Sequence, residues 1–173
     1  MFLDRDGTLI EDRGYLSDPA GVEFFPETIP ALQRLAGHFE LFLVTNQAGI
    51  ALGITPAEAV ARVNDYVADV LARAGAPLRA VYCCPHSRED GCLCRKPSPH
   101  FLLKAAADHG IELARSFVVG DHPHDVQCGL NAKARGILVL TGHGSAHGDE
   151  VPPGGEIVQG IAEAAELILG RLG

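Results

Sequence analysis

Short apolar runs alternate with amphipathic stretches along the chain of 173 residues. An apolar run bounded by turn residues is typical of a buried strand, whereas apolar residues at every third or fourth position are typical of a helix. This pattern predicts five strands, at residues 2–3, 39–44, 79–83, 116–119 and 136–140. It also predicts helices at residues 26–36, 55–74, 98–110, 125–134 and 157–172.

Two segments of the chain lack both periodicities. Residues 12–25 contain Gly14, Pro19 and Gly21, and residues 142–155 are rich in Gly, Pro and His. Because such compositions favour loops, we expect the first segment to be loop-like and the second to be a mobile surface loop.

Strands that alternate with helices predict an α/β fold. In such a fold a parallel sheet, here of about five strands, is covered by helices on both faces. The length suits one domain that buries its own core, and the sequence shows no internal repeat. Residues 1–173 are therefore expected to form a single domain.

The charge balance of the chain limits its partners. It has 22 acidic and 14 basic residues, a net charge of −8, and no cluster of Lys and Arg. This argues against nucleic acid as a partner but leaves room for a small phosphate ester drawn in by a bound metal ion. Without a long apolar run or a leader-like amino terminus, we expect a cytoplasmic protein that is not attached to a membrane. A monomer is the default expectation.

The densest chemistry lies at the amino terminus, where Asp4-Arg5-Asp6-Gly7-Thr8 follows the apolar pair Phe2-Leu3. Carboxyl ends of parallel strands are where open α/β sheets bind ligands. Two carboxylates this close repel each other unless a cation offsets their charge, which predicts a cation site with one carboxylate free to attack or to transfer a proton. The alternative is an ordinary acidic turn. Thr45 and Asp121 also end predicted strands, so these polar groups should meet Asp4 at one edge.

A second cluster combines Cys84-Pro85-His86 with Cys92-Leu93-Cys94. Three thiolates and one imidazole within so short a segment predict a structural zinc site in a loop at residues 84–94. Incidental thiols are the alternative, and a redox pair is disfavoured because the spacing is Cys-x-Cys. The ion would fix the neighbouring Arg95 and Lys96 in place without taking part in a reaction.

These motifs together resemble the haloacid dehalogenase (HAD) superfamily of phosphohydrolases, over residues 2 to about 141. The matching residues are Asp4-x-Asp6-Gly7-Thr8, Thr45-Asn46, Lys96 and Gly120-Asp121-x-x-x-Asp125. The cysteine cluster followed by Arg95-Lys96-Pro97 is similar to the capless branch that contains heptose-bisphosphate and histidinol-phosphate phosphatases. The resemblance implies a Rossmann-like HAD fold without a cap domain.

The resemblance also implies a mechanism. Asp4 would be the nucleophile that forms an aspartyl-phosphate, and Asp6 the general acid and base. Thr45 and Lys96 would bind the transferring phosphoryl group. Mg²⁺ would be held by the Asp4 carboxylate, the Asp6 main-chain carbonyl and Asp121, with Asp125 in support. An anionic nucleophile needs such cations to approach a phosphoryl group.

Asn46, Gln47, Arg95 and His122 are the expected substrate contacts. Residues 45–51 are similar to the heptose enzymes, which favours removal of the 7-phosphate of D-glycero-D-manno-heptose 1,7-bisphosphate, a step toward activated heptose for lipopolysaccharide. Histidinol phosphate is the alternative, and a non-catalytic zinc-stabilised interaction module is a third possibility.

Two positions depart from the heptose pattern. Leu52 and His122 stand where that pattern usually has Arg and Lys, and His122 supplies a positive charge only when protonated. The loops at residues 11–21, 47–53 and 84–97 are expected to line the site.

Overall fold

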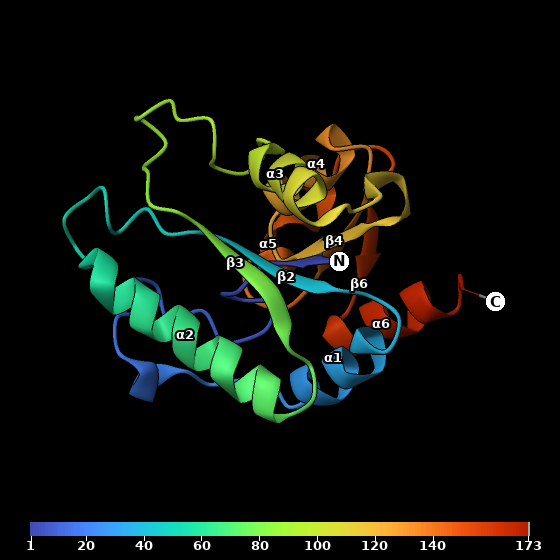
Figure 1. Ribbon diagram of the computed structural model, residues 1–173. Helices are drawn as coiled ribbons and strands as arrows, with labels where there is room; N and C mark the ends of the chain where they lie inside the picture. The colour runs from blue at the N-terminus through green and yellow to red at the C-terminus, as the bar shows by residue number, and fades with distance from the viewer. Residues whose placement is uncertain (173) are drawn as a thin grey trace.

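A parallel sheet of six strands forms the centre of the fold (Figure 1). The computed structural model describes residues 1–172. The strand order is β3-β2-β1-β4-β5-β6, and every neighbouring pair is parallel. This is the order of a Rossmann-like fold, so the predicted fold class is confirmed. The strands are β1 Phe2–Leu3, β2 Leu41–Asn46, β3 Leu78–Cys84, β4 Phe117–Gly120, β5 Arg135–Val139 and β6 Glu156–Val158.

Helices cover both faces of this sheet (Figure 1). One face carries α1 (Thr28–Ala36), α2 (Ala57–Arg73) and α6 (Ile161–Leu169), and the other carries α3 (His100–His109) and α4 (Pro123–Asn131). Each helix layer has its own apolar core, because the inner strands β1, β2, β4 and β5 are buried on both faces and their side chains point alternately to one layer and the other.

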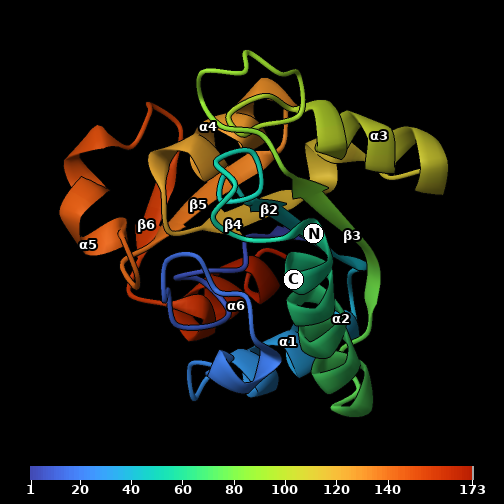
Figure 2. The same cartoon turned by 90° about the vertical axis from the view of Figure 1, so that its left-hand side faces the viewer.

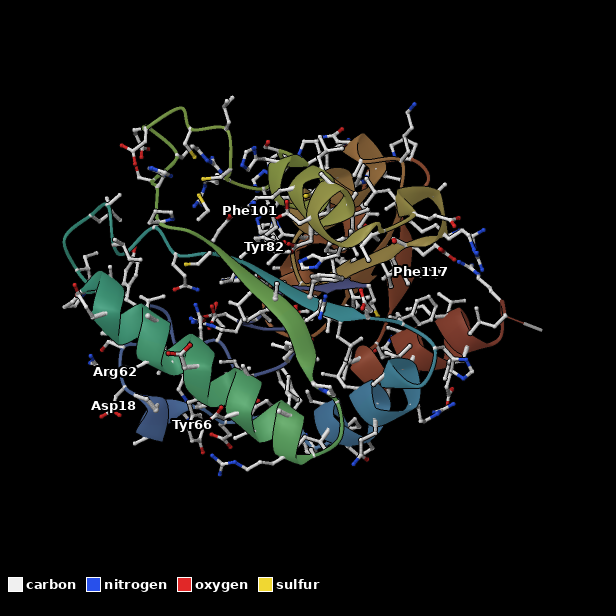
Figure 3. All side chains as sticks on the ribbon, viewed as in Figure 1. Asp18, Arg62, Tyr66, Tyr82, Phe101 and Phe117 are labelled. Carbon is white, nitrogen blue, oxygen red and sulfur yellow. The ribbon has the colours of Figure 1, made fainter. Side chains whose placement is uncertain are left out.

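The core beneath α3 includes a row of stacked aromatic rings. Tyr82 of β3 lies against Phe101 of α3, with ring centroids 5.3 Å apart (Figure 3). Phe42 of β2 stacks in turn on Phe2 of β1, at 5.2 Å. These contacts seat α3 on the sheet, and α3 follows directly on the segment that carries Lys96.

The carboxy-terminal part of the chain differs from the prediction. Residues 156–158 form the sixth strand, β6, which pairs with β5, and the last helix begins only at Ile161. The prediction of five strands and of a helix from residue 157 was therefore wrong here. A strand of three residues is too short to show a period of two, and Ile157 on this edge strand is 47% exposed. The preceding segment, predicted as a loop, contains the short helix α5 (Gly144–His147).

The topology places the site. From β1 the sheet extends through β2 on one side and β4 on the other, and ligands of such sheets bind in the crevice at the carboxyl ends of the strands next to this switch point. Figure 2 looks toward that edge, where the loops after β1, β2 and β3 surround the strand ends. Within residues 1–172 these loops contain no inserted folded domain. No helix of the described chain is long and apolar enough to span a membrane.

Candidate active site

A cleft of about 280 Å³ lies at the carboxyl ends of the strands. The residues that line it include every expected catalytic, magnesium-binding and substrate-binding side chain: Asp4, Asp6, Thr45, Asn46, Gln47, Arg95, Lys96, Asp121, His122 and Asp125. The lining also includes residues from each of the three loops expected around the site, at residues 11–21, 47–53 and 84–97. The structure thus brings these predicted side chains into one place, although they come from distant parts of the chain.

Asp4 and Lys96 form a buried ion pair at the floor of the cleft. The Lys96 Nζ donates to Asp4 Oδ1 at 2.6 Å and to the Val44 carbonyl at 2.8 Å, and it lies 2.5 Å from Asp125 Oδ1. Burial raises the pKa of Asp4 to about 6, against the opposing effect of Lys96. Burial by itself lowers the pKa of Lys96, but the Asp125 and Asp4 carboxylates raise it above its ordinary value. Lys96 is therefore a permanent cation beside the expected nucleophile.

Asp121 follows β4, and its carboxylate packs against Gly7 and Gly142, where a larger residue would clash with it. A Cβ on Gly7 would lie 2.0 Å from Asp121 Oδ2, and one on Gly142 would lie 2.2 Å from it. The same oxygen accepts a hydrogen bond from the His143 backbone at 2.8 Å. Burial, followed by repulsion from Asp4, raises the pKa of Asp121 to about 8.

The carboxylates of this cleft are a suitable metal site. One oxygen each from Asp4, Asp121 and Asp125 lies within 4.8 Å of the others. Lys96 pairs with Asp4 and Asp125, whereas within residues 1–172 Asp121 has no ion pair, so the three carboxylates have excess negative charge that a divalent cation would offset. Oxygen ligands of this kind suit Mg²⁺. The predicted contribution of the Asp6 main-chain carbonyl stays a prediction.

Asp6 is held from two sides. Gln47 Nε2 donates to Asp6 Oδ2 at 2.8 Å and also to Thr45 Oγ at 2.8 Å. The Arg5 guanidinium contacts both carboxylate oxygens from the other side, at 2.9 to 3.1 Å. Burial raises the pKa of Asp6, and Arg5 opposes this effect. Gln47 thus links the expected general acid to the hydroxyl expected to bind the phosphoryl group.

Asn46, an expected substrate contact that lines the cleft, also contacts the backbone of Lys96. Its Oδ1 accepts from the Lys96 backbone N–H at 3.1 Å, and its Nδ2 donates to the Lys96 carbonyl at 3.4 Å. Both ends of the amide are therefore engaged by the backbone of Lys96. This contact ties the end of the cysteine-rich loop to β2 and positions the lysine.

His122 lines the cleft but does not bring a positive charge to it. It is the N-cap of α4, and its Nδ1 accepts from the His124 backbone N–H at 3.1 Å. Burial, followed by repulsion from His124 and two other histidines, lowers the pKa of His122 to about 4. The imidazole is neutral at physiological pH, so it does not replace the lysine of the heptose pattern in charge.

The cysteine-rich loop, residues 84–94, brings its four predicted ligands together. One ligand atom each from Cys84, His86, Cys92 and Cys94 lies within 4.8 Å of the others. The Sγ–Sγ distances are 3.2, 3.6 and 3.7 Å. A tetrahedral zinc with Zn–S bonds of about 2.3 Å holds sulfur atoms about 3.8 Å apart, so the donor set fits zinc. Arg95, just after the loop, donates to the His86 carbonyl at 3.1 Å and lines the cleft.

The cleft also contains side chains outside the set of expected site residues. They are Asp12, Tyr15, Arg88, His124 and His143. His143 Nε2 lies 2.8 Å from Asp12 Oδ2, so the loop after β1 contacts the segment after β5. Their loops were expected around the site or on the surface, but no local pattern predicts which of their side chains face inward.

Comparison with known proteins agrees with this arrangement. The HAD-hydrolase-like family model matches residues 93–164. The D-glycero-β-D-manno-heptose-1,7-bisphosphate 7-phosphatase of Helicobacter pylori strain J99 is 39% identical over 82% of this chain and 82% of its own. The enzyme of the same name from Pasteurella multocida is 37% identical over 98% of this chain and 96% of its own.

A solved structure agrees as well. The D,D-heptose 1,7-bisphosphate phosphatase of B. bronchiseptica, complexed with magnesium and phosphate, has a TM-score of 0.91 and 31% identity, over 99% of this chain and 98% of its own. Fold and site together thus define a HAD-type phosphatase, a phosphoric monoester hydrolase. Within that superfamily, the chain belongs to the family that contains these heptose-bisphosphate phosphatases.

Proposed function

We propose that the protein is a magnesium-dependent phosphatase that removes the 7-phosphate of D-glycero-D-manno-heptose 1,7-bisphosphate through an aspartyl-phosphate on Asp4. The observation that carries the proposal is the Asp4 carboxylate at the floor of the cleft, with Lys96 Nζ at 2.6 Å and two further carboxylates able to share a cation. The names of the relatives support the heptose substrate.

In the first half-reaction an oxygen of Asp4 attacks phosphorus, and the bond between phosphorus and the sugar oxygen breaks. Asp6 gives its proton to that leaving oxygen, while Lys96 and Thr45 bind the phosphoryl oxygens. In the second half-reaction Asp6 takes a proton from water as the water oxygen attacks phosphorus. Inorganic phosphate leaves, and Asp4 regains its carboxylate. Mg²⁺, held by Asp4, Asp121 and Asp125, would supply positive charge against the phosphoryl oxygens.

Two arginines support a substrate with a second phosphate. Arg88 and Arg95 line the same cleft as Asp4 and lie on the loop that follows β3. A guanidinium binds phosphate through two parallel hydrogen bonds, which a neutral leaving group does not require. Histidinol phosphate, which has one phosphate and a cationic amino group, is a poorer match to this pair.

The test is phosphate release in Mg²⁺ from the α and β anomers of the heptose bisphosphate and from histidinol phosphate. We expect kcat/KM for the better anomer to exceed that for histidinol phosphate by about 10²-fold or more, since the arginines then bind a group that histidinol phosphate lacks. Preference for histidinol phosphate would overturn the substrate and leave the mechanism standing. Release from none of the three would overturn the proposed function.

We also propose that Cys84, His86, Cys92 and Cys94 hold a structural Zn²⁺. The prediction is that Cys94→Ser loses most of the bound zinc and lowers kcat by roughly 10- to 100-fold, because Arg95 and Lys96 follow directly and small displacements of catalytic groups are costly. Zinc content by elemental analysis and phosphate release are the two measurements. Cys83→Ser is the matched control, since this free thiol lies outside the cluster and should leave the zinc in place. Zinc retained in Cys94→Ser would contradict the ligand set.

A further inference from the structure

Arg5 is a fully buried cation between the two aspartates of the first motif. Its side chain is 0% exposed. Within residues 1–172 the carboxylate at ion-pair distance from it is that of Asp6. A buried guanidinium is costly unless it is paired, and a purely structural position is filled as well by an apolar side chain. The charge of Arg5 is therefore directed at the expected general acid.

The geometry of the contact restricts the Asp6 side chain. Arg5 Nε donates to both carboxylate oxygens at 3.1 Å, and Nη2 donates to Oδ1 at 3.0 Å. The planar fork of a guanidinium fixes both the position and the plane of a carboxylate, which the point charge of a lysine does not. With Gln47 on Oδ2 at 2.8 Å, the carboxylate has little rotational freedom.

Arg5 is itself fixed by Asn64 of α2. Its Nη1 donates to Asn64 Oδ1 at 2.6 Å, a buried contact between residues far apart in the sequence. The other buried side chains of α2 are apolar: Ala59, Val60, Val63, Val67 and Leu71. Arg62 and Tyr66 lie on the outer side of this helix (Figure 3). An asparagine on the apolar face is explained by its contact with Arg5.

We propose that Arg5, fixed by Asn64, is the positioning residue for the Asp6 carboxylate, holding it where it can give a proton to the leaving oxygen. The inference rests on the proposed aspartyl-phosphate mechanism. It assigns no contact between Arg5 and the substrate. Asn64 of α2 thus holds Arg5, and Arg5 in turn holds Asp6, the group that protonates the leaving alcohol.

The test uses the dependence on the leaving group. An alkyl phosphate needs its leaving oxygen protonated, whereas 2,4-dinitrophenyl phosphate has a leaving group that departs without a proton. The quantity compared is kcat/KM, because it reports the steps up to release of the alcohol and not the later hydrolysis of the aspartyl-phosphate. The variants are Arg5→Lys and Asn64→Leu, with Asp6→Asn as the benchmark for loss of the acid.

We expect Arg5→Lys to lower kcat/KM for the heptose bisphosphate by about 10²-fold, the lower end of what a general acid contributes, and for the dinitrophenyl ester by less than about fivefold. Asn64→Leu should show the same selective loss at about 10-fold, since Arg5 keeps its contact with Asp6 but loses its anchor. Arg73→Lys, an exposed arginine of the same helix paired with Asp69, is the control and should change neither value.

Equal losses on both esters in Arg5→Lys and Asn64→Leu, or no loss on either, would overturn the positioning role. If Arg5→Lys does not fold, by thermal unfolding and zinc content, Asn64→Leu decides alone. The Asp6→Asn benchmark separates the two proposals. If Asp6→Asn lowers kcat/KM equally for both esters, or if the wild type is inactive on both, the result counts against the proposed mechanism itself. A selective loss in Asp6→Asn that Arg5→Lys and Asn64→Leu do not share counts against the positioning role alone.

Discussion

Asp4→Asn is expected to abolish turnover while leaving the fold and the zinc content unchanged. The amide keeps the size of the side chain but has no anionic oxygen to attack phosphorus, so kcat should fall by roughly 10⁴-fold or more, as for removal of other enzymic nucleophiles. The substitution also removes one of three buried carboxylates, and repulsion from Asp4 is one cause of the raised pKa of Asp121. Phosphate release and thermal unfolding are the two measurements.

Two comparisons make this result specific. Asp65→Asn changes an exposed carboxylate on α2 and should leave kcat within twofold, roughly, of the wild type. Acid-quenched wild-type enzyme should carry phosphate on the peptide that contains Asp4, and the Asp4→Asn enzyme should carry none. Turnover retained in Asp4→Asn, with the same peptide phosphorylated elsewhere, would remove Asp4 from the role of nucleophile.

The framework of the site could be predicted because it depends on local pattern. Apolar runs placed the ends of β1, β2 and β4, and parallel topology then brought Asp4, Thr45 and Asp121 to one edge. The cysteine cluster was predictable for the same reason, since its four ligands lie within one short segment. Lys96 was found through its motif. Neither the charge pattern nor the helical periodicity around it indicates that this lysine is buried.

The contacts that tune the site are not local, and the sequence did not indicate them. Arg5 and Asn64 are 59 residues apart, and Asn46 and Lys96 are 50 apart, so each contact depends on how a loop or helix packs on the sheet. The capping contact of His122 depends on the rotamer of one side chain. The sixth strand was missed because three residues on an exposed edge have no distinctive pattern.

Lys96→Met should lower kcat by about 10²- to 10³-fold, the effect of removing one preorganised charge from a transition state. It should also destabilise the fold, because Lys96 Nζ pairs with both Asp4 and Asp125 and breaking such a buried pair costs about 3–5 kcal/mol. Methionine keeps the length of the aliphatic stem, so lost packing is a small part of the effect. Phosphate release in saturating Mg²⁺ and thermal unfolding without added Mg²⁺ measure the two consequences separately.

The loss of stability in Lys96→Met should grow with pH, and this dependence identifies its cause. Asp4 has a pKa of about 6 in the folded protein, against its ordinary value of 3.8. The folded state therefore loses stability as pH rises from 3.8 to about 6, because the unfolded chain ionises first. Removing Lys96 takes away the effect that lowers this pKa, so the folded value moves further up. Without added Mg²⁺, the difference in free energy of unfolding from wild type should therefore be smaller near about pH 5 than near about pH 8. Lys104→Met, which breaks an exposed pair with Asp108, is the control and should show little change at either pH. A loss for Lys96→Met that is the same at both pH values would mean that the charge opposite Asp4 is not the main contribution of Lys96 to the fold.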